Sequence, residues 1–153
     1  MLHYDTQTYL TMLRELTEAG KEVSLTVFGS SMFPFLTDRR DTVLFSKPKT
    51  PLQKGDIVFY QRAGGQFVLH RICEIQGGLL KISGDAQWAL EPVPADRVFA
   101  RVDKVCRNGR WIGPDSRIWK FFQHTWVTCL PIRRFLLFFC RQFARIRRHL
   151  KRK

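Results

Sequence analysis

The last quarter of the chain contains no acidic residue. Residues 116–153 carry 11 lysines and arginines and no aspartate or glutamate, whereas residues 1–115 carry 15 basic and 13 acidic residues. The formal net charge of +13 therefore belongs mainly to the C-terminal segment. A nearly neutral body argues against nucleic-acid binding over the whole surface, and it leaves the C-terminal segment as the part that would contact an anionic partner.

Long apolar runs and paired cysteines are also missing. The sequence has no stretch of about 18 uninterrupted apolar residues, and its N-terminus lacks a basic segment followed by an apolar one, so we expect neither a membrane span nor a signal peptide. The four cysteines, at positions 73, 106, 129 and 140, form no CxxC pair and no Cys/His spacing typical of zinc. We therefore expect reduced thiols in a cytoplasmic protein, with no metal and no organic cofactor.

Two periodicities divide the chain. In segment 1–21, Tyr9, Leu10, Leu13 and Leu16 recur near helical spacing and predict an N-terminal helix. In segment 22–115, runs rich in β-branched and aromatic residues predict at least six strands: VSLTVF, DTVLFS, DIVFYQR, FVLHRICEI, LLKISG and RVFARVDKV. Turn residues separate these runs, as in IQGG, ALEPVPAD and RNG. This spacing predicts a mainly β domain, built as a curled antiparallel sheet or a small barrel.

Segment 116–153 is predicted to form two amphipathic helices, interrupted at Pro131. The second has an apolar stripe with arginines broadly opposite it; the stripe consists of Ile132, Phe135, Leu136, Phe139, Phe143, Ile146 and Leu150. Two interpretations remain open. The pair of helices would bind an anionic membrane surface, with Trp119, Trp126 and the phenylalanines in the interface, or the first helix would pack on the sheet as core and leave only a solvated basic end.

Three residues form a candidate catalytic set. Ser31 lies in the stretch VFGSSMFPFL, His70 in VLHRI and Asp85 in SGDAQ, each at a predicted strand edge or turn. A serine nucleophile needs a base to remove its proton, and the base needs a group that orients it. Each residue alone is more often structural. The other charged residues nearby are assigned to structure: Asp41 and Asp56 to strand edges and turns, and Arg71 to an ion pair with a nearby acid.

This ordered set resembles the signal peptidase I and LexA-like serine peptidases, the S24/S26 families. Their nucleophile is the serine directly before Met in an S-M-x-P box, which is Ser31 in SSMFP. The HRI box implies that His70 is the base, and the family's Gly-Asp box implies a role for Asp85, with Asp96 as the alternative third member. The GDIVFY segment, residues 55–60, is similar to the strand that follows the family's first hairpin. The resemblance covers residues 26–105. A histidine base is typical of the endoplasmic-reticulum and SipW-like branch, so the chain resembles a small standalone bacterial member.

The resemblance implies a serine endopeptidase that cleaves a peptide or protein precursor, with backbone N–H groups near Ser31 stabilising the oxyanion. Gly29 stands where many signal peptidases have a Ser or Thr oxyanion donor. The alternative is a weak or inactive binding module whose basic tail contacts membrane or nucleic acid. Of these two partners, nucleic acid is the less favoured. We expect a cytoplasmic protein, either free or attached peripherally to the inner face of the membrane.

Overall fold

The computed structural model describes residues 6–150. Helix α1 (Thr6–Glu18) comes first. The strands are β1 (Val23–Thr26), β2 (Asp41–Ser46), β3 (Ile57–Gln61), β4 (Phe67–Gln76), β5 (Leu79–Ser83), β6 (Glu91–Pro94), β7 (Val98–Arg107) and β8 (Arg110–Ile112), with the short 3-10 helix η1 (Ala95–Arg97) before β7. The C-terminal helices are α2 (Arg117–Lys120), the π-helix η2 (Phe121–Trp126) and α3 (Arg133–Leu150).

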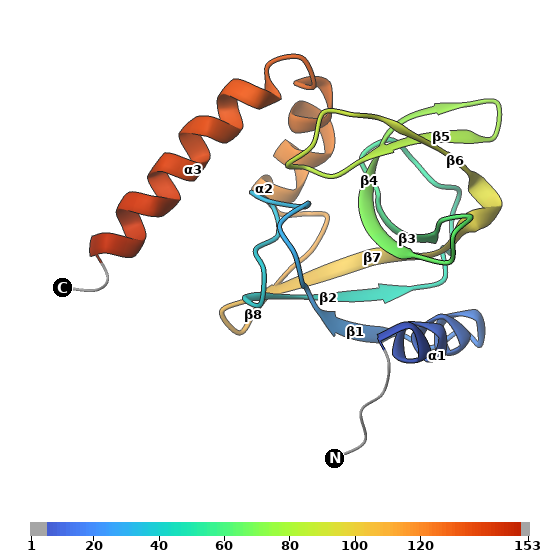
Figure 1. Ribbon diagram of the computed structural model, residues 1–153. Coiled ribbons are helices and arrows are strands. Elements are labelled where there is room, and N and C mark those ends of the chain that lie inside the picture. The colour runs from blue at the N-terminus through green and yellow to red at the C-terminus, as the bar shows by residue number, and fades with distance from the viewer. Residues whose placement is uncertain (1–5, 151–153) are drawn as a thin grey trace.

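All strand pairs in the sheet are antiparallel, and the strand order is β1-β2-β7-β3-β4-β5-β6, with β8 paired to β7. The sheet curls strongly (Figure 1), yet no pairing between β1 and β6 closes it within the described residues. The expected mainly β, antiparallel architecture with helices at both ends of the chain is confirmed. The form is an open curled sheet.

Two strands were not expected from the sequence. Strand β6 lies inside ALEPVPAD, which reads as a loop because of its prolines, and it pairs with β5 in the register Leu79↔Pro94 and Lys81↔Pro92. Proline is tolerated in β6 because this strand lies at the edge of the sheet, where the missing N–H groups leave no neighbouring strand without a hydrogen-bond donor. Strand β8 follows the turn at Asn108 and Gly109, whose φ angles of 50° and 75° are those of a tight hairpin.

The curled sheet separates two clusters of buried apolar side chains. Successive residues of β3 point to opposite faces, so Ile57 and Phe59 join the larger cluster while Val58 and Tyr60 join the smaller one. The larger cluster takes residues from all three segments of the chain, including Leu13 of α1 and Leu137 of α3. On α1 the apolar face is only partly covered, because Tyr9 and Leu16 remain exposed.

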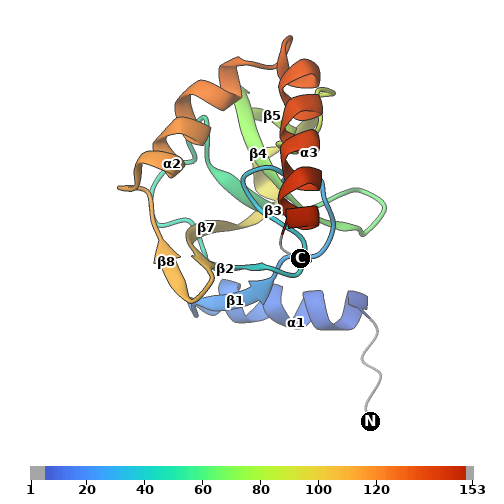
Figure 2. The same cartoon turned by 90° about the vertical axis from the view of Figure 1, so that its left-hand side faces the viewer.

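The first half of the basic tail belongs to the core. Trp119, Phe122 and Trp126 are 4%, 7% and 3% exposed and pack in the larger cluster. Of the two interpretations that the sequence left open, the structure agrees with the packing of the first tail helix as core. The insertion of Trp119 and Trp126 into a membrane interface is wrong, because both indoles are covered by protein. Helix α3 instead runs away from the sheet (Figures 1 and 2). Within residues 6–150, no helix combines the length and apolar character that crossing a membrane requires.

Candidate functional site

Ser31 lies in an irregular loop between β1 and β2 that is anchored on both sides. Met32, Phe35 and Leu36 are buried in the larger core, and the Phe33–Pro34 peptide bond is cis. Ser31 itself is partly exposed, and its neighbour Ser30 is exposed. The apolar residues after the serine thus fix the loop to the core while the hydroxyl stays near the surface, which explains why two serines stand in an apolar stretch.

A second turn, Gly84–Ala86, presses against this loop. The backbone N–H of Ala86 donates to the carbonyl oxygen of Ser31 at 2.8 Å. A Cβ atom at Gly84 would lie 2.5 Å from the same oxygen, closer than real side chains approach, so only glycine permits this packing. The SGD box that the sequence pointed to therefore contacts the candidate nucleophile through its backbone.

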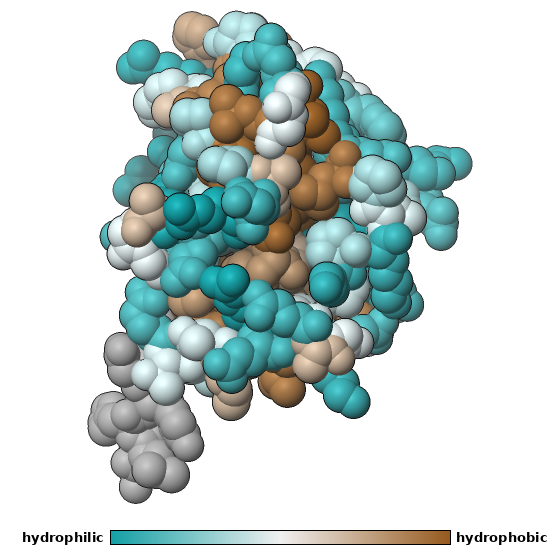
Figure 3. Space-filling view, turned by 90° about the vertical axis from the view of Figure 1, so that its right-hand side faces the viewer, coloured by the Kyte–Doolittle hydropathy of each residue, from teal (hydrophilic) through white to brown (hydrophobic). Residues whose placement is uncertain are grey.

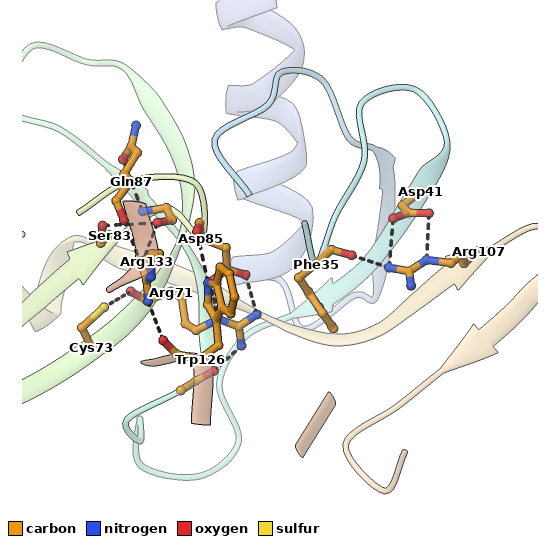
Figure 4. Close-up of polar contacts among 12 residues, drawn as sticks. Phe35, Asp41, Arg71, Cys73, Ser83, Asp85, Gln87, Arg107, Trp126 and Arg133 are labelled. Carbon is orange, nitrogen blue, oxygen red and sulfur yellow. Dashed lines mark hydrogen bonds and ion pairs between the residues drawn. The ribbon is translucent and has the colours of Figure 1, made fainter. Parts of the chain in front are cut away.

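The Asp85 carboxylate is engaged by Arg71 (Figure 4). Arg71 Nε and Nη2 donate to the two carboxylate oxygens at 2.8 Å each, and both side chains are fully buried. Arg71 also donates to the carbonyl of Gly55 and places its guanidinium 4.9 Å from the ring centre of Phe35. The ion pair expected for Arg71 is present, and its acid is Asp85. The hydrogen bonds of the Asp85 carboxylate thus go to Arg71 and none goes to His70 in the described structure.

His70, on β4, faces a chain of polar groups that the sequence did not reveal. Its Nδ1 lies 3.4 Å from the hydroxyl of Tyr60, which in turn donates to Glu91 Oε2 at 2.8 Å. Glu91 is held by Arg62 through a contact of 2.6 Å. Because the Tyr60 proton is directed at Glu91, the histidine tautomer that fits carries its proton on Nδ1. Nε2 then keeps the lone pair that a general base needs.

The environment of His70 strongly favours the neutral imidazole. Burial lowers the pKa of His70 to about 4, and the positive charge of Arg62 adds to this effect, against weaker opposition from Glu91 and Asp85. The hydrogen bond from Arg62 lowers the pKa of Glu91 despite its partial burial. The pKa of Tyr60 is raised, first by burial and then by its bond to Glu91. At neutral pH the network therefore consists of a carboxylate, a neutral phenol and a neutral imidazole.

A cavity of about 430 Å³ opens beside His70. Its wall includes Arg62, Ala86, Glu91 and the exposed apolar side chains of Trp88 and Leu90. Ala86, which binds the Ser31 carbonyl through the backbone hydrogen bond described above, therefore lies in the wall of the cavity that His70 also lines. No hydrogen bond joins the Ser31 hydroxyl to His70 among the described residues.

Asp96, the alternative third member, faces a different cavity. It lies exposed in η1 and borders a cavity of about 740 Å³ together with Arg14, Leu52 and Val98, whereas His70 does not line that cavity. Figure 3 shows the face of the molecule on the side of η1, where apolar side chains gather in the centre and hydrophilic ones surround them. The structure therefore does not bring Asp96 to the cavity of His70.

Neither a search for metal-binding clusters among the described residues nor a comparison with known proteins identifies a further functional site. In the part of the chain that the structure describes, no group of three or more His, Cys, Asp or Glu side chains is placed to hold a metal ion. No protein-family model matches the chain, and no curated protein matches it significantly.

The buried imidazole predicts a specific loss of stability in acid. Between pH 6.5 and 4 the unfolded chain protonates His70 while the folded chain does not, so the free energy of unfolding falls as pH falls across this window. A pKa lowered to about 4 corresponds to roughly 3 kcal/mol of lost stability at pH 4. Urea unfolding at both pH values should show this loss in the wild type, and a smaller pH dependence in His70→Gln. Equal pH dependence in the wild type and in His70→Gln would contradict the assignment.

Proposed function

We propose that the protein is a serine endopeptidase of the signal peptidase I-like, S24/S26 type, with Ser31 as nucleophile and His70 as general base. The observation that carries the proposal is the docking of the Ser31 loop on the Gly84–Ala86 turn, at the edge of the cavity that His70 lines. The tautomer of His70 supports it further, because the lone pair of Nε2 is not used by the Tyr60–Glu91 chain.

The proposed reaction proceeds by acyl transfer. His70 Nε2 takes the proton of the Ser31 hydroxyl as its oxygen attacks the scissile carbonyl, and the resulting imidazolium returns a proton to the leaving amine. Water, deprotonated by the same imidazole, then releases the acyl group and regenerates the serine. Tyr60 and Glu91 act as positioning residues that hold the imidazole, the part that the sequence had given to Asp85. Asp85 has a structural role instead: it binds Arg71 and lies in the turn that contacts the Ser31 loop.

Backbone N–H groups supply the proposed oxyanion hole. The N–H of Gly29 donates to Asp38 Oδ1 at 2.8 Å and is therefore occupied. The N–H groups of Ser31 and Met32 donate no hydrogen bond within the described residues. Both lie at the nucleophile itself, and such donors stabilise a developing oxyanion without a charged side chain. Although position 29 lacks a Ser or Thr side chain, the oxyanion hole can therefore be formed by main-chain N–H groups alone.

The cavity favours an extended substrate with small or apolar side chains near the scissile bond. Ala86, Trp88, Ala89 and Leu90 form an apolar wall of this cavity. An extended peptide can place such side chains against this wall.

A binding module without catalysis is the second candidate. It is favoured by two observations, the lack of a hydrogen bond between Ser31 and His70 and the low pKa of His70, since a weakly basic imidazole gives little driving force for removing a hydroxyl proton. The same cavity would then hold an extended peptide without cleaving it.

Covalent labelling separates the two candidates. A fluorophosphonate probe should modify wild-type protein at Ser31, identified by mass spectrometry of the tryptic peptide, because a serine with an adjacent base reacts where an ordinary serine does not. Ser31→Ala and His70→Gln should abolish labelling, while Ser30→Ala should retain it as the matched control. If the wild type stays unlabelled, or if Ser31→Ala is labelled as strongly as the wild type, the binding module is the better supported candidate.

A further inference from the structure

Helix α3 presents an uncovered apolar stripe. Its inner side packs on the molecule through Leu137 and the fully buried Arg133. The outer side carries large apolar side chains that remain between 52% and 72% exposed: Ile132 just before the helix, and Phe135, Phe138, Phe139, Phe143 and Ile146 within it. Soluble surfaces rarely carry a continuous patch of this kind without a partner.

Positive charge runs along the same helix. With about 3.6 residues per turn, Phe135, Phe139 and Phe143 line one side of α3, and the exposed residues Arg134, Arg141 and Arg145 lie broadly on the other. The helix sequence contains no acidic residue that would neutralise these arginines. An apolar stripe with cationic side chains beside it is the pattern of helices that lie in the interface of an anionic bilayer.

We propose that α3 binds the surface of an anionic lipid bilayer, with its phenylalanines inserted below the headgroups and its arginines bound to lipid phosphates. Charge complementarity selects this occupant. A second copy of the chain would bring two strongly cationic helices together, and a nucleic-acid backbone would meet the arginines but leave the phenylalanine stripe in water. A bilayer covers both features at once.

The base of α3 is hydrogen-bonded to the turn that contacts the Ser31 loop. Arg133 Nη1 donates to the carbonyls of Gly84 and Gln87, and its Nη2 donates to the carbonyl of Trp126. Further along the helix, Arg141 lines the cavity beside His70. If the peptidase proposed above operates there, membrane binding would deliver substrates at the bilayer surface. The lipid contact itself rests only on α3 and does not require catalysis.

Vesicle binding by the full-length protein tests the inference. The protein should float with vesicles of phosphatidylcholine containing phosphatidylglycerol and not with pure phosphatidylcholine vesicles, and added salt should weaken binding. Phe139→Ser with Phe143→Ser should lower the partition coefficient about tenfold for each phenylalanine. Arg134→Gln with Arg145→Gln should lower it about fivefold for each arginine. Because these four side chains are exposed, the variants should keep the wild-type melting temperature.

Matched controls lie on β8, where Trp111 is 52% exposed and Arg110 is also exposed. Trp111→Ser and Arg110→Gln should bind vesicles as the wild type does. The inference is overturned if anionic vesicles are not bound, if the paired phenylalanine variant binds them undiminished, or if the protein binds duplex DNA more tightly than vesicles. Since Ser31→Ala should float like the wild type, an inactive enzyme that still binds lipid would sink only the proposed function.

Discussion

Replacing Asp85 with asparagine should lower the free energy of unfolding by about 3 to 5 kcal/mol, because it leaves the buried guanidinium of Arg71 without a counter-charge. Both side chains are fully buried, and the two bonds of 2.8 Å are the main polar contacts of the pair. The effect should extend beyond the pair, since the Asp85 carbonyl accepts the indole N–H of Trp126 at 3.1 Å and joins the turn to η2. Urea unfolding followed by circular dichroism at pH 7 measures the change.

An exposed ion pair supplies the control for Asp85. Lys81 and Glu74 lie 3.0 Å apart on the surface, and Glu74→Gln should cost at most about 1 kcal/mol. A second variant addresses the mechanism: Arg71→Met combined with Asp85→Leu should be less destabilised than the sum of the single changes, because no charge stays buried alone. If Asp85→Asn unfolds at the same urea concentration as the wild type, the pair does not have the structural weight that its geometry implies.

The strands were predictable because alternation and turn residues are local signals. Strand β3 shows the limit of such signals, since IVFYQ is buried on both faces and gives no hint of which residue is functional. Strand β6 was missed because Pro92 and Pro94 argue against a strand, and only its place at the sheet edge removes the objection. Sequence alone could not reveal that position, which depends on the order of strands far apart in the chain.

The partners of the candidate base lay beyond sequence reasoning for the same reason. Tyr60 and Glu91 are 31 residues apart. Tyr60 ends the GDIVFY box of the family resemblance, but that box gave it no role, and Glu91 lies outside the boxes. Asp85 did belong to one of these boxes, but its carboxylate pairs with the buried guanidinium of Arg71 and not with His70. In the antiparallel register Arg71 lies opposite Ser83, two residues before Asp85, which brings the two charges together across the strands. Burial of Arg71 thus decides which group the carboxylate contacts.

The sequence pattern of residues 116–153 likewise could not predict which of the two helices packs on the sheet. The residues of 117–130 and of α3 have similar amphipathic spacing, and apolar content alone does not distinguish a face covered by protein from one covered by lipid. The structure separates them through tertiary packing: Trp119 and Trp126 lie against the sheet core, whereas Phe139 and Phe143 face outward. Removal of residues 116–153 would therefore destroy the core, and point changes in α3 are the appropriate test of membrane binding.

Under the proposed mechanism, Ser31→Ala should lower kcat/KM for peptide cleavage by at least about a thousandfold, and His70→Gln by about a hundredfold to ten-thousandfold, without a matching loss of stability at pH 7. Because the two groups act in one step, the double variant should be no slower than the slower single variant. The measurement follows a peptide library containing small apolar residues by mass spectrometry, then determines kcat and KM on the best substrate. Ser30→Ala, one residue away on the exposed side of the loop, should remain close to wild type.

The pH profile tells a base from a residue that merely supports the fold. With a pKa of about 4, His70 stays neutral through the physiological range, so kcat/KM should fall only as the pH drops toward 4. The charge of Arg62 lowers this pKa, and its removal in Arg62→Gln should move the acidic limb of the profile to higher pH. Tyr60→Phe should reduce kcat by about tenfold, because the imidazole loses the acceptor that fixes its tautomer. An acidic limb that stays at the same pH in Arg62→Gln would separate His70 from the rate-determining proton transfer and would favour a binding role for the cavity.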